Sequence, residues 1–323
     1  MNIRYRTEDD MPRATNHEES LPSDHQLRLT RARLSLEGLS TGDAFGEGFF
    51  GFGANVEFAI PKRWLPPTPW EYTDDTIMAI SVLEVLHKAG RIDQDELARL
   101  FAARYAAEPD RGYGGTAMKI LSQVAQGQDW RTASSSAFGG EGSMGNGSAM
   151  RVGPVGAYFA DDLEEAVRQA SASAEVTHQH PEGIAGAIAV AVAAALAWRT
   201  GTSAHPRRHG AIIEAAIDLT PAGVVREGLA TAARFSPGTD PGEAAAILGN
   251  GSRVTCPDTV PFCLWCAETH LESFEQALWA AVSALGDADT NCAIVGSIVA
   301  MGTGVEGIPP AWLASREALP ALL

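Results

Sequence analysis

Apolar residues recur at helical spacing along most of this chain, from Leu27 to about Pro310. Gly- and Pro-rich connections separate one such stretch from the next. No segment shows the alternation of β-branched and polar residues that is typical of a half-buried strand. Only 7% of the residues are aromatic, which suits closely packed helices better than a β-sandwich or barrel. The pattern therefore predicts an all-α fold.

The helical stretches follow one another without a linker long enough to divide them. We expect helices near residues 28–46, 74–89, 93–106, 114–126, 145–159, 161–173, 181–199, 207–218, 221–235, 241–247, 258–268, 272–284 and 288–302. Three N-terminal caps are predicted, each an Asp or Ser three residues before a Glu or Gln: Asp93, Asp161 and Ser273. We predict a mobile polar arm over residues 1–27 and one compact multi-helix domain over residues 28–323.

Charge and cysteine content limit the environment and the partners. The chain has 24 Lys plus Arg against 40 Asp plus Glu, a net charge of -16, so duplex nucleic acid is not an expected partner. Its 4 cysteines are too few and too clustered for a disulfide framework, and Cys263 and Cys266 lie in an apolar helical stretch where core packing is expected. The N-terminus has no apolar signal core, and the apolar stretch from Ile184 to Trp198 is too short to predict a membrane span. We expect a cytoplasmic protein without a membrane partner.

Two short segments place several oxygen donors on neighbouring residues at predicted helix starts. They are Thr73-Asp74-Asp75-Thr76 and Asp287-Ala288-Asp289-Thr290. Neighbouring carboxylates repel each other unless a cation or the free amides of a helix start offset their charge, so each segment alone is also compatible with simple helix capping. Two such clusters, far apart in sequence, can converge in a helical bundle, and this favours a metal site. Oxygen donors of this kind suit Mg²⁺ or Mn²⁺, whereas Zn²⁺ prefers His and Cys.

These segments belong to a longer series of motifs that resembles the ADP-ribosylglycohydrolase family, which includes dinitrogenase reductase-activating glycohydrolase and the ADP-ribosyl-acceptor hydrolases. The resemblance spans about Leu27 to Leu313. In chain order the motifs are Gly42-Asp43-Ala44-Phe45-Gly46, Thr73-Asp74-Asp75-Thr76, Arg111-Gly112-Tyr113-Gly114, Gly145-Asn146-Gly147-Ser148-Ala149-Met150-Arg151, His178-Gln179-His180-Pro181 and Gly286-Asp287-Ala288-Asp289-Thr290.

The resemblance implies a compact all-α fold with a binuclear Mg²⁺ or Mn²⁺ centre in a central cleft. The metal ligands that it implies are Thr73, Asp74, Asp75, Asp287, Asp289 and Thr290. The residues that it implies around ADP-ribose are Gly114, Gly115, Asn146, Gly147, Ser148 and His178. The chemistry of the segment from Gly145 to Ser148 agrees, because glycines expose backbone amides to a diphosphate and a serine hydroxyl adds a donor. An ordinary Gly-rich turn is the alternative.

The implied activity is hydrolysis of the glycosidic bond between ADP-ribose and a modified protein or small-molecule acceptor, with ADP-ribose as a product. Cleavage builds positive charge on the ribose, and two metal ions can hold the ribose hydroxyls and lower the pKa of a bound water. Either Asp75 or Asp289 is expected to act as the base. The alternatives are a module that binds ADP-ribose without cleaving it and a structural relative, since the family includes a jellyfish lens crystallin. The complete set of aspartates and threonines in both clusters favours catalysis.

One position departs from the family pattern. Family members commonly carry a glutamate seven residues after the Asp of the first motif, where this chain has Phe50. Glu47 precedes Phe50 by three residues and would share a helix face with it, so we predict that Glu47 supplies a catalytic carboxylate. Glu57, in a segment similar to the family sequence around that glutamate, is the other candidate. An enzyme without this carboxylate is the third possibility.

Overall fold

The structure, a computed structural model, describes residues 21–202, 208–236 and 238–321 of the chain. Residues 1–20 of the predicted arm lie outside the described residues. The described part is helical, and its β-pairing is limited to the isolated bridges Trp70–Arg316 and Gly145–Thr255. The all-α prediction is therefore confirmed for the described residues.

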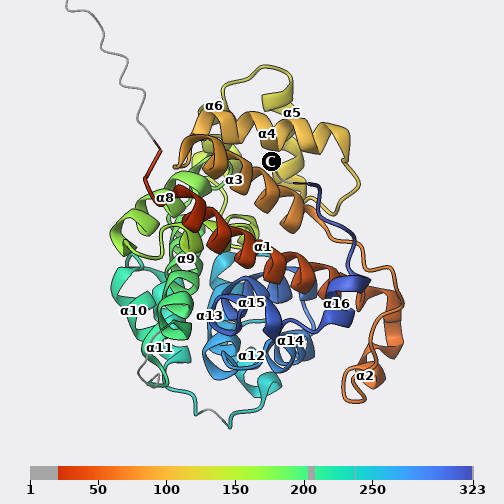
Figure 1. The fold of residues 1–323 in the computed structure, drawn as a ribbon. Helices are drawn as coiled ribbons and strands as arrows, with labels where there is room; N and C mark the ends of the chain where they lie inside the picture. The colour runs from red at the N-terminus through yellow and green to blue at the C-terminus, as the bar shows by residue number, and fades with distance from the viewer. Residues whose placement is uncertain (1–20, 203–207, 237, 322–323) are drawn as a thin grey trace, which may run out of the picture.

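The helices follow one another along the chain with short connections (Figure 1). The α-helices are α1 (His25–Glu47), α2 (Val56–Ala59), α3 (Asp74–Ala89), α4 (Gln94–Ala107), α5 (Gly115–Ala125), α6 (Trp130–Ser135), α7 (Gly153–Tyr158), α8 (Leu163–Glu175), α9 (Pro181–Gly201), α10 (Ala211–Leu219), α11 (Val224–Ala232), α12 (Pro241–Leu248), α13 (Cys256–Thr269), α14 (Phe274–Ser283), α15 (Ala288–Thr303) and α16 (Pro310–Ser315). The 3₁₀ turns are η2 (Phe50–Asn55), η3 (Ala137–Gly140), η4 (Asn146–Ser148) and η5 (Val305–Gly307).

Helix α1 crosses the middle of the molecule, between α3 to α6 on one side and α13 to α15 on the other (Figure 1). Its most extensive contact is with α15. Three glycines of α1, spaced four residues apart, lie directly against the α15 backbone. A Cβ would come within 2.3 Å of Gly296 O at Gly38, 2.1 Å of Cys292 O at Gly42 and 2.3 Å of Ala288 O at Gly46. No larger residue fits at these positions, so the two helices are held at backbone contact.

Helix α9 is the most apolar long helix of the bundle. By length and composition it is able to cross a membrane, but 72% of its most apolar window is buried inside the protein. It packs against α7, α8, α10, α13 and α15. Its apolar character is therefore explained by its place in the core.

Several helix starts agree with the sequence and others differ. The helix expected over residues 145–159 is wrong: this stretch forms only η4 and α7, and α10 and α11 also start three or four residues later than expected. Asp93 caps α4 and Ser273 caps α14 as predicted, through Glu96 N and Gln276 N. The prediction for Asp161 is wrong by one residue: Asp162 caps α8, and the Asp161 carboxylate accepts a hydrogen bond from Arg31 instead (2.6 Å). Helix α1 starts at His25, inside the stretch expected to be an arm, because the buried His25 ring bonds the Tyr158 hydroxyl (2.6 Å).

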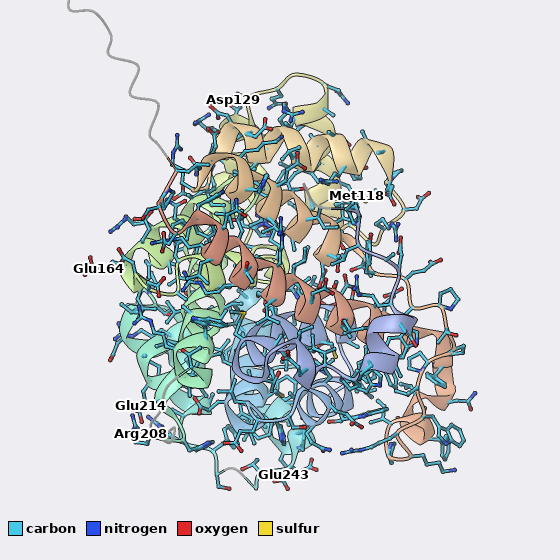
Figure 2. The ribbon with its side chains drawn as sticks, viewed as in Figure 1. Met118, Asp129, Glu164, Arg208, Glu214 and Glu243 are labelled. Atoms are coloured by element: carbon cyan, nitrogen blue, oxygen red, sulfur yellow. The ribbon has the colours of Figure 1, made fainter. Side chains whose placement is uncertain are left out.

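The cysteines lie in the core, and many charged residues lie at the surface, as expected for a folded acidic protein. The cysteines Cys256, Cys263, Cys266 and Cys292 are buried and free, which confirms core packing for the pair in α13. Charged residues such as Glu164, Arg208, Glu214 and Glu243 lie exposed at the periphery (Figure 2). The net negative charge is therefore carried largely by solvated side chains, and the buried acids described next are an exception that needs a specific explanation.

Candidate active site

The start of α3 is held by a carboxylate from another helix. Asp43 of α1 is fully buried and accepts hydrogen bonds from Thr73 N (3.0 Å) and from the Thr73 hydroxyl (2.9 Å). It also accepts from the backbone amide and the hydroxyl of Thr76. Thr73 in turn caps α3 by accepting from Asp75 N. Asp43 therefore fixes the segment that carries Asp74 and Asp75.

The start of α15 is held in a similar way by amides. Asn146 donates to Asp287 Oδ2 (2.7 Å) and to the Thr259 hydroxyl (3.0 Å). The backbone oxygen of Asn250 accepts from Asp287 N (3.2 Å) and from the Asn291 side chain (2.8 Å). Asn146, predicted as a substrate residue, thus lies at the cavity but uses both side-chain N–H groups inside the protein.

The two acid clusters face one cavity of about 550 Å³. Asp74 and Asp75 line it from α3, and Asp287, Asp289 and Thr290 line it from the start of α15. Gly114, Gly115, Asn146, Gly147 and His178 line the same cavity. Two predicted residues, Thr73 and Ser148, are buried behind its wall. Clusters more than 200 residues apart in sequence are therefore brought together.

Burial and mutual repulsion make the ionised form of these acids unfavourable. Burial, followed by the charge of Asp43, raises the pKa of Asp74 to about 8. The pKa of Asp75 is raised well above its ordinary value by burial and then by Asp43 and Asp289. Burial and Asp287 do the same to the pKa of Asp289. Asp43, despite its hydrogen bonds, has a pKa raised by burial to about 6.

Two carboxylate oxygens in the clusters have no hydrogen-bond partner among the residues that the structure describes. They are Asp75 Oδ2 and Asp289 Oδ1, one from each cluster, and both are buried. A buried polar atom without a partner is costly, and a bound cation would remove both the cost and the repulsion. The described residues hold no three His, Cys, Asp or Glu side chains that already enclose a point as metal ligands would. The donors thus suit Mg²⁺ or Mn²⁺ in chemistry and burial, without forming a closed cage.

The Gly-rich segment wraps around the ring of His178. A Cβ at Gly145 would lie 3.1 Å from His178 Nε2, and one at Gly147 would lie 3.2 Å from the same atom. Ser148 differs from its predicted role: its hydroxyl donates to Gly183 O (2.7 Å) and is fully buried. Ser143, which lines the cavity and accepts from Gly145 N (3.1 Å), is the serine of this segment that faces the cavity.

Gly114 and Gly115 lie at the start of α5. Gly114 is the N-cap, and no side chain caps this helix. No heavy atom of another described residue, apart from the chain neighbours, lies within 4 Å of a Cβ placed on either glycine, so their backbone faces open space in the cavity wall. Free amides at a helix start attract anions, which agrees with the predicted role.

The three positions weighed for the missing glutamate lie in different surroundings. Glu47 ends α1 and is partly buried; burial raises its pKa, and the charges of Asp287 and then Glu71 raise it further. Phe50 and Glu57 are exposed, in η2 and α2. Glu47 does not line the cavity, but it lies close enough to the Asp287 cluster to interact with it electrostatically. Glu71, just before Thr73, is an additional acid that the sequence reasoning missed.

The sequence motifs do not identify several other residues that line the cavity. Phe138, 64% exposed with a left-handed φ of 51°, and Glu141 line the cavity. Arg253 is the one Arg or Lys among the described residues that line it. No local sequence signal distinguishes them from ordinary loop residues, because only the fold brings residues 138–141 and 253–255 to the same cavity.

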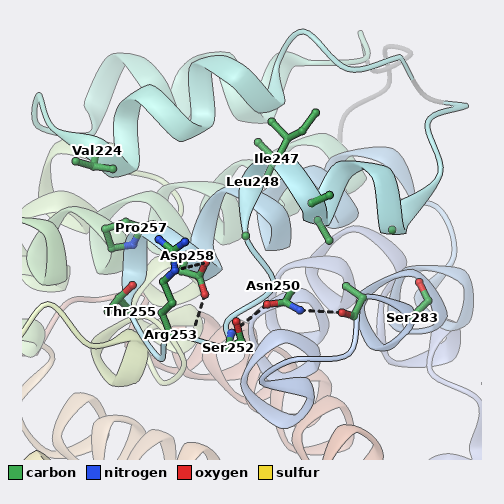
Figure 3. A pocket seen from close by; sticks show the side chains of 15 residues that line it. Val224, Ile247, Leu248, Asn250, Ser252, Arg253, Thr255, Pro257, Asp258 and Ser283 are labelled. Atoms are coloured by element: carbon green, nitrogen blue, oxygen red, sulfur yellow. Dashed lines mark hydrogen bonds and ion pairs between the residues drawn. The ribbon is translucent and has the colours of Figure 1, made fainter. Parts of the chain in front are cut away.

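Arg253 and Thr255 also line a second cavity, of about 530 Å³ (Figure 3). The loop between the cavities is firmly held: Arg253 N donates to Asp258 Oδ2 (2.9 Å), and Val254 O accepts from Asn146 N (3.2 Å). Val254 has a φ of 54°, which is unfavourable for a β-branched residue and is the kind of strain often found at functional sites. The loop is therefore a rigid wall of the candidate site.

Comparisons with known proteins identify the family of this chain. The sequence model of the ADP-ribosylglycohydrolase family matches residues 24–322. The chain belongs to the ADP-ribosylglycohydrolase family. It is 26% identical to ADP-ribosylhydrolase ARH3 of Homo sapiens, over 90% of this chain and 90% of that relative. It is 25% identical to the ADP-ribosyl-[dinitrogen reductase] glycohydrolase of Rhodospirillum rubrum, over 89% of this chain and 90% of the relative.

A solved structure described as an ADP-ribosylglycohydrolase-related protein complex has the same fold. Its TM-score is 0.60 at 25% identity, covering 90% of this chain and 94% of that one. The family assignment made from the sequence motifs is thus confirmed, and relatives over nearly the whole chain support ADP-ribose hydrolysis in general.

Proposed function

We propose that this family member removes ADP-ribose from a modified protein or small molecule with the help of two divalent cations, Mg²⁺ or Mn²⁺. The observation that carries the proposal is the pair of unpartnered carboxylate oxygens, Asp75 Oδ2 and Asp289 Oδ1, which come from two converging acid clusters. Like charges buried without a counterion destabilise a protein, so such an arrangement is best explained by a cation that binds there.

The ligands in this proposal are Thr73, Asp74 and Asp75 at the start of α3, and Asp287, Asp289 and Thr290 at the start of α15; all of them line the cavity except Thr73, which is buried behind its wall. Such ions, when bound, supply Lewis-acid binding of ribose hydroxyls and lower the pKa of a water. Asp43 and Asn146 hold the two clusters in place through the hydrogen bonds described above. In this proposal the Asp43 carboxylate and the Asn146 amide position the acids, and the acids bind the divalent ions.

The rest of the cavity suits the nucleotide diphosphate. The amides at Gly114, Gly115 and Gly147 are donors for phosphate oxygens, and Arg253 brings a positive charge to an otherwise acidic wall. Phe138 exposes an aromatic face at the same cavity, which suits stacking with a base.

Water attack needs a base, and departure of the acceptor benefits from an acid. Asp75 and Asp289 are both candidates to orient a water, since each has an oxygen without a hydrogen-bond partner among the described residues. Glu47 is the candidate acid: burial and the neighbouring negative charges raise its pKa, which favours the protonated form that donates. Because Glu47 does not line the cavity, it would pass its proton to the leaving group through a water. A separate proposal concerns the location of the protein. Its four cysteines are buried and free, which suits a reducing compartment, so we propose the cytoplasm.

Release of ADP-ribose is the decisive test. The protein is incubated with ADP-ribosylated arginine, serine and other acceptors, with Mg²⁺, with Mn²⁺ or with EDTA, and free ADP-ribose is measured. The proposal expects metal-dependent release from at least one acceptor. Tight ADP-ribose binding with no release from any acceptor would instead identify a binding module. Absence of both binding and release would favour a structural role.

A further inference from the structure

His178 occupies a defined position at the wall of the cavity. It lies in the connection between α8 and α9, and it is buried except for 7% of its surface. Nε2 is the ring atom beside Gly145 and Gly147. Nδ1, on the other side of the ring, lies 2.7 Å from the Thr177 hydroxyl. The proton of the neutral ring can sit on either nitrogen, and its location decides what His178 offers a ligand.

The Thr177 hydroxyl is already an acceptor. Arg151 Nη2 donates to Thr177 Oγ1 (2.9 Å), and a guanidinium can only donate. The hydroxyl has one hydrogen, and the structure gives Thr177 no other side-chain hydrogen bond within the described residues. The hydrogen is therefore directed to His178 Nδ1. It follows that Nδ1 is unprotonated and that the ring proton is on Nε2.

Arg151 is itself rigidly held. It is fully buried, and it donates to Ser173 O (2.9 Å) and to Gly147 O (3.0 Å). Its guanidinium also lies over the Phe101 ring, 4.6 Å from the centroid. The same side chain thus fixes both the carbonyl of the Gly-rich segment and, through Thr177, the ring that this segment surrounds.

The environment keeps the ring neutral. Burial, with the charge of Arg151 added to it, lowers the pKa of His178 to about 3. Near neutral pH the ring therefore carries a single proton. The structure gives Nε2 no hydrogen-bond partner within the described residues, although His178 lines the cavity.

We propose that Arg151 and Thr177 are positioning residues that lock His178 in the Nε2-protonated tautomer, so that it donates a hydrogen bond to an oxygen of the bound nucleotide. The second half of this inference rests on the proposed function, because it takes ADP-ribose as the ligand. The first half concerns the protein alone. Neither residue touches the ligand in this scheme; each acts through His178.

The test uses Thr177→Val, which removes the hydroxyl with little change in shape, and Thr177→Ser, which restores it. Thr220→Val is the matched control, since Thr220 is a buried threonine whose hydroxyl has no partner in the described chain. Nitrogen-15 NMR of the full-length protein at neutral pH reports which ring nitrogen is protonated, with the signals assigned by His178→Gln. Calorimetry measures ADP-ribose affinity.

We expect the wild type and Thr177→Ser to show a protonated Nε2 and an unprotonated Nδ1. Thr177→Val should lose this preference and bind ADP-ribose about tenfold more weakly, which corresponds to the loss of one hydrogen bond. Thr220→Val should behave as the wild type. The recovery with serine separates the hydroxyl's role from any loss of packing.

Two outcomes would overturn the inference. A protonated Nδ1 in the wild type would refute the tautomer, whatever the protein binds. Unchanged ADP-ribose affinity in Thr177→Val, with its tautomer altered, would refute the role in binding. If the wild type does not bind ADP-ribose, the proposed function fails, while the NMR measurement still decides the tautomer.

Discussion

The carboxylate of Asp43, near the C-terminal end of α1, accepts hydrogen bonds from both the backbone amide and the hydroxyl of Thr73, the residue that caps α3. A helix start is usually capped from its own flanking residues. Here the cap is secured from a second helix, and the same helix α1 packs against α15. Asp43 therefore links the position of one acid cluster to the helix that lies beside the other.

Replacing this carboxylate should loosen the start of α3. Asp43→Asn keeps the size of the side chain but leaves one acceptor oxygen for the donors of Thr73 and Thr76. Unsatisfied buried donors cost about 1–3 kcal/mol, so we expect a loss of this size in the free energy of unfolding, measured by urea denaturation. Asp93→Asn, at the local cap of α4, is the control and should cost less. Equal losses in the two variants would show that the contact between helices adds nothing.

Metal binding should require both clusters. Asp289→Ala removes an oxygen that has no other partner, so calorimetry with Mg²⁺ or Mn²⁺ should show a marked loss of affinity. The metal-free variant should be at least as stable as the metal-free wild type, because a buried carboxyl that repels the neighbouring acids when it is ionised is removed. Glu164→Ala, at an exposed position of α8, is the control. Full two-metal affinity in Asp289→Ala would exclude Asp289 as a ligand.

The metal-free protein should become less stable as the pH rises from about 6.5 to about 8. Asp74, with a pKa raised to about 8, keeps a proton in the folded state that the unfolded chain has already released. Deprotonation therefore favours unfolding across this window, whereas the lowered pKa of His178 acts mainly below it. In EDTA, the melting temperature of the wild type should fall as the pH rises, and that of Asp74→Asn should fall less steeply. Added Mg²⁺ should raise the melting temperature of the wild type most at pH 8. A melting temperature that rises with pH in EDTA would contradict the buried repulsion.

Turnover should distinguish the candidate acids. Glu47→Gln should reduce turnover on the best acceptor by at least about tenfold, since general acid catalysis typically contributes about 10²- to 10⁴-fold. Metal affinity should change little, because Glu47 is not one of the proposed metal ligands. Glu57→Gln, at an exposed position of α2, should leave turnover unchanged. Wild-type turnover in Glu47→Gln would remove Glu47 from the mechanism, and Glu71→Gln would then be the variant to measure.

The elements predicted well are those whose signals are local. Helix α3 has the predicted bounds, and α15 differs by one residue, since apolar periodicity and a cluster of capping residues define both starts. The sequence also predicts that the two acid clusters converge. Neighbouring carboxylates repel each other, and one bound cation can offset the charge of both clusters if they lie together. The family motifs supplied the order in which the remaining site residues occur.

The failures occur where distant contacts override local preference. A helix was expected over residues 145–159, but only η4 and α7 form, because Asn146 N bonds Val254 O and Gly147 O accepts from Arg151. The cap expected at Asp161 moves to Asp162 because Arg31 binds the Asp161 carboxylate. Arg253 and Phe138 have no signal in the sequence, since only the folded chain places them at one cavity.

The glycines of α1 set a dimension of the candidate site. Since Gly38, Gly42 and Gly46 leave no side chain between α1 and α15, the separation of the two helix axes is a property of the main chain. Asp43 joins α3 to the same helix through its hydrogen bonds, so α1 sets the distance between the two groups of acids. Changes in core side chains elsewhere can alter melting behaviour without changing the gap across which the acids face each other. For the divalent ions of the proposed function, the ionic radius that this gap accepts would therefore depend on the main chain and not on the side chains of the surrounding core.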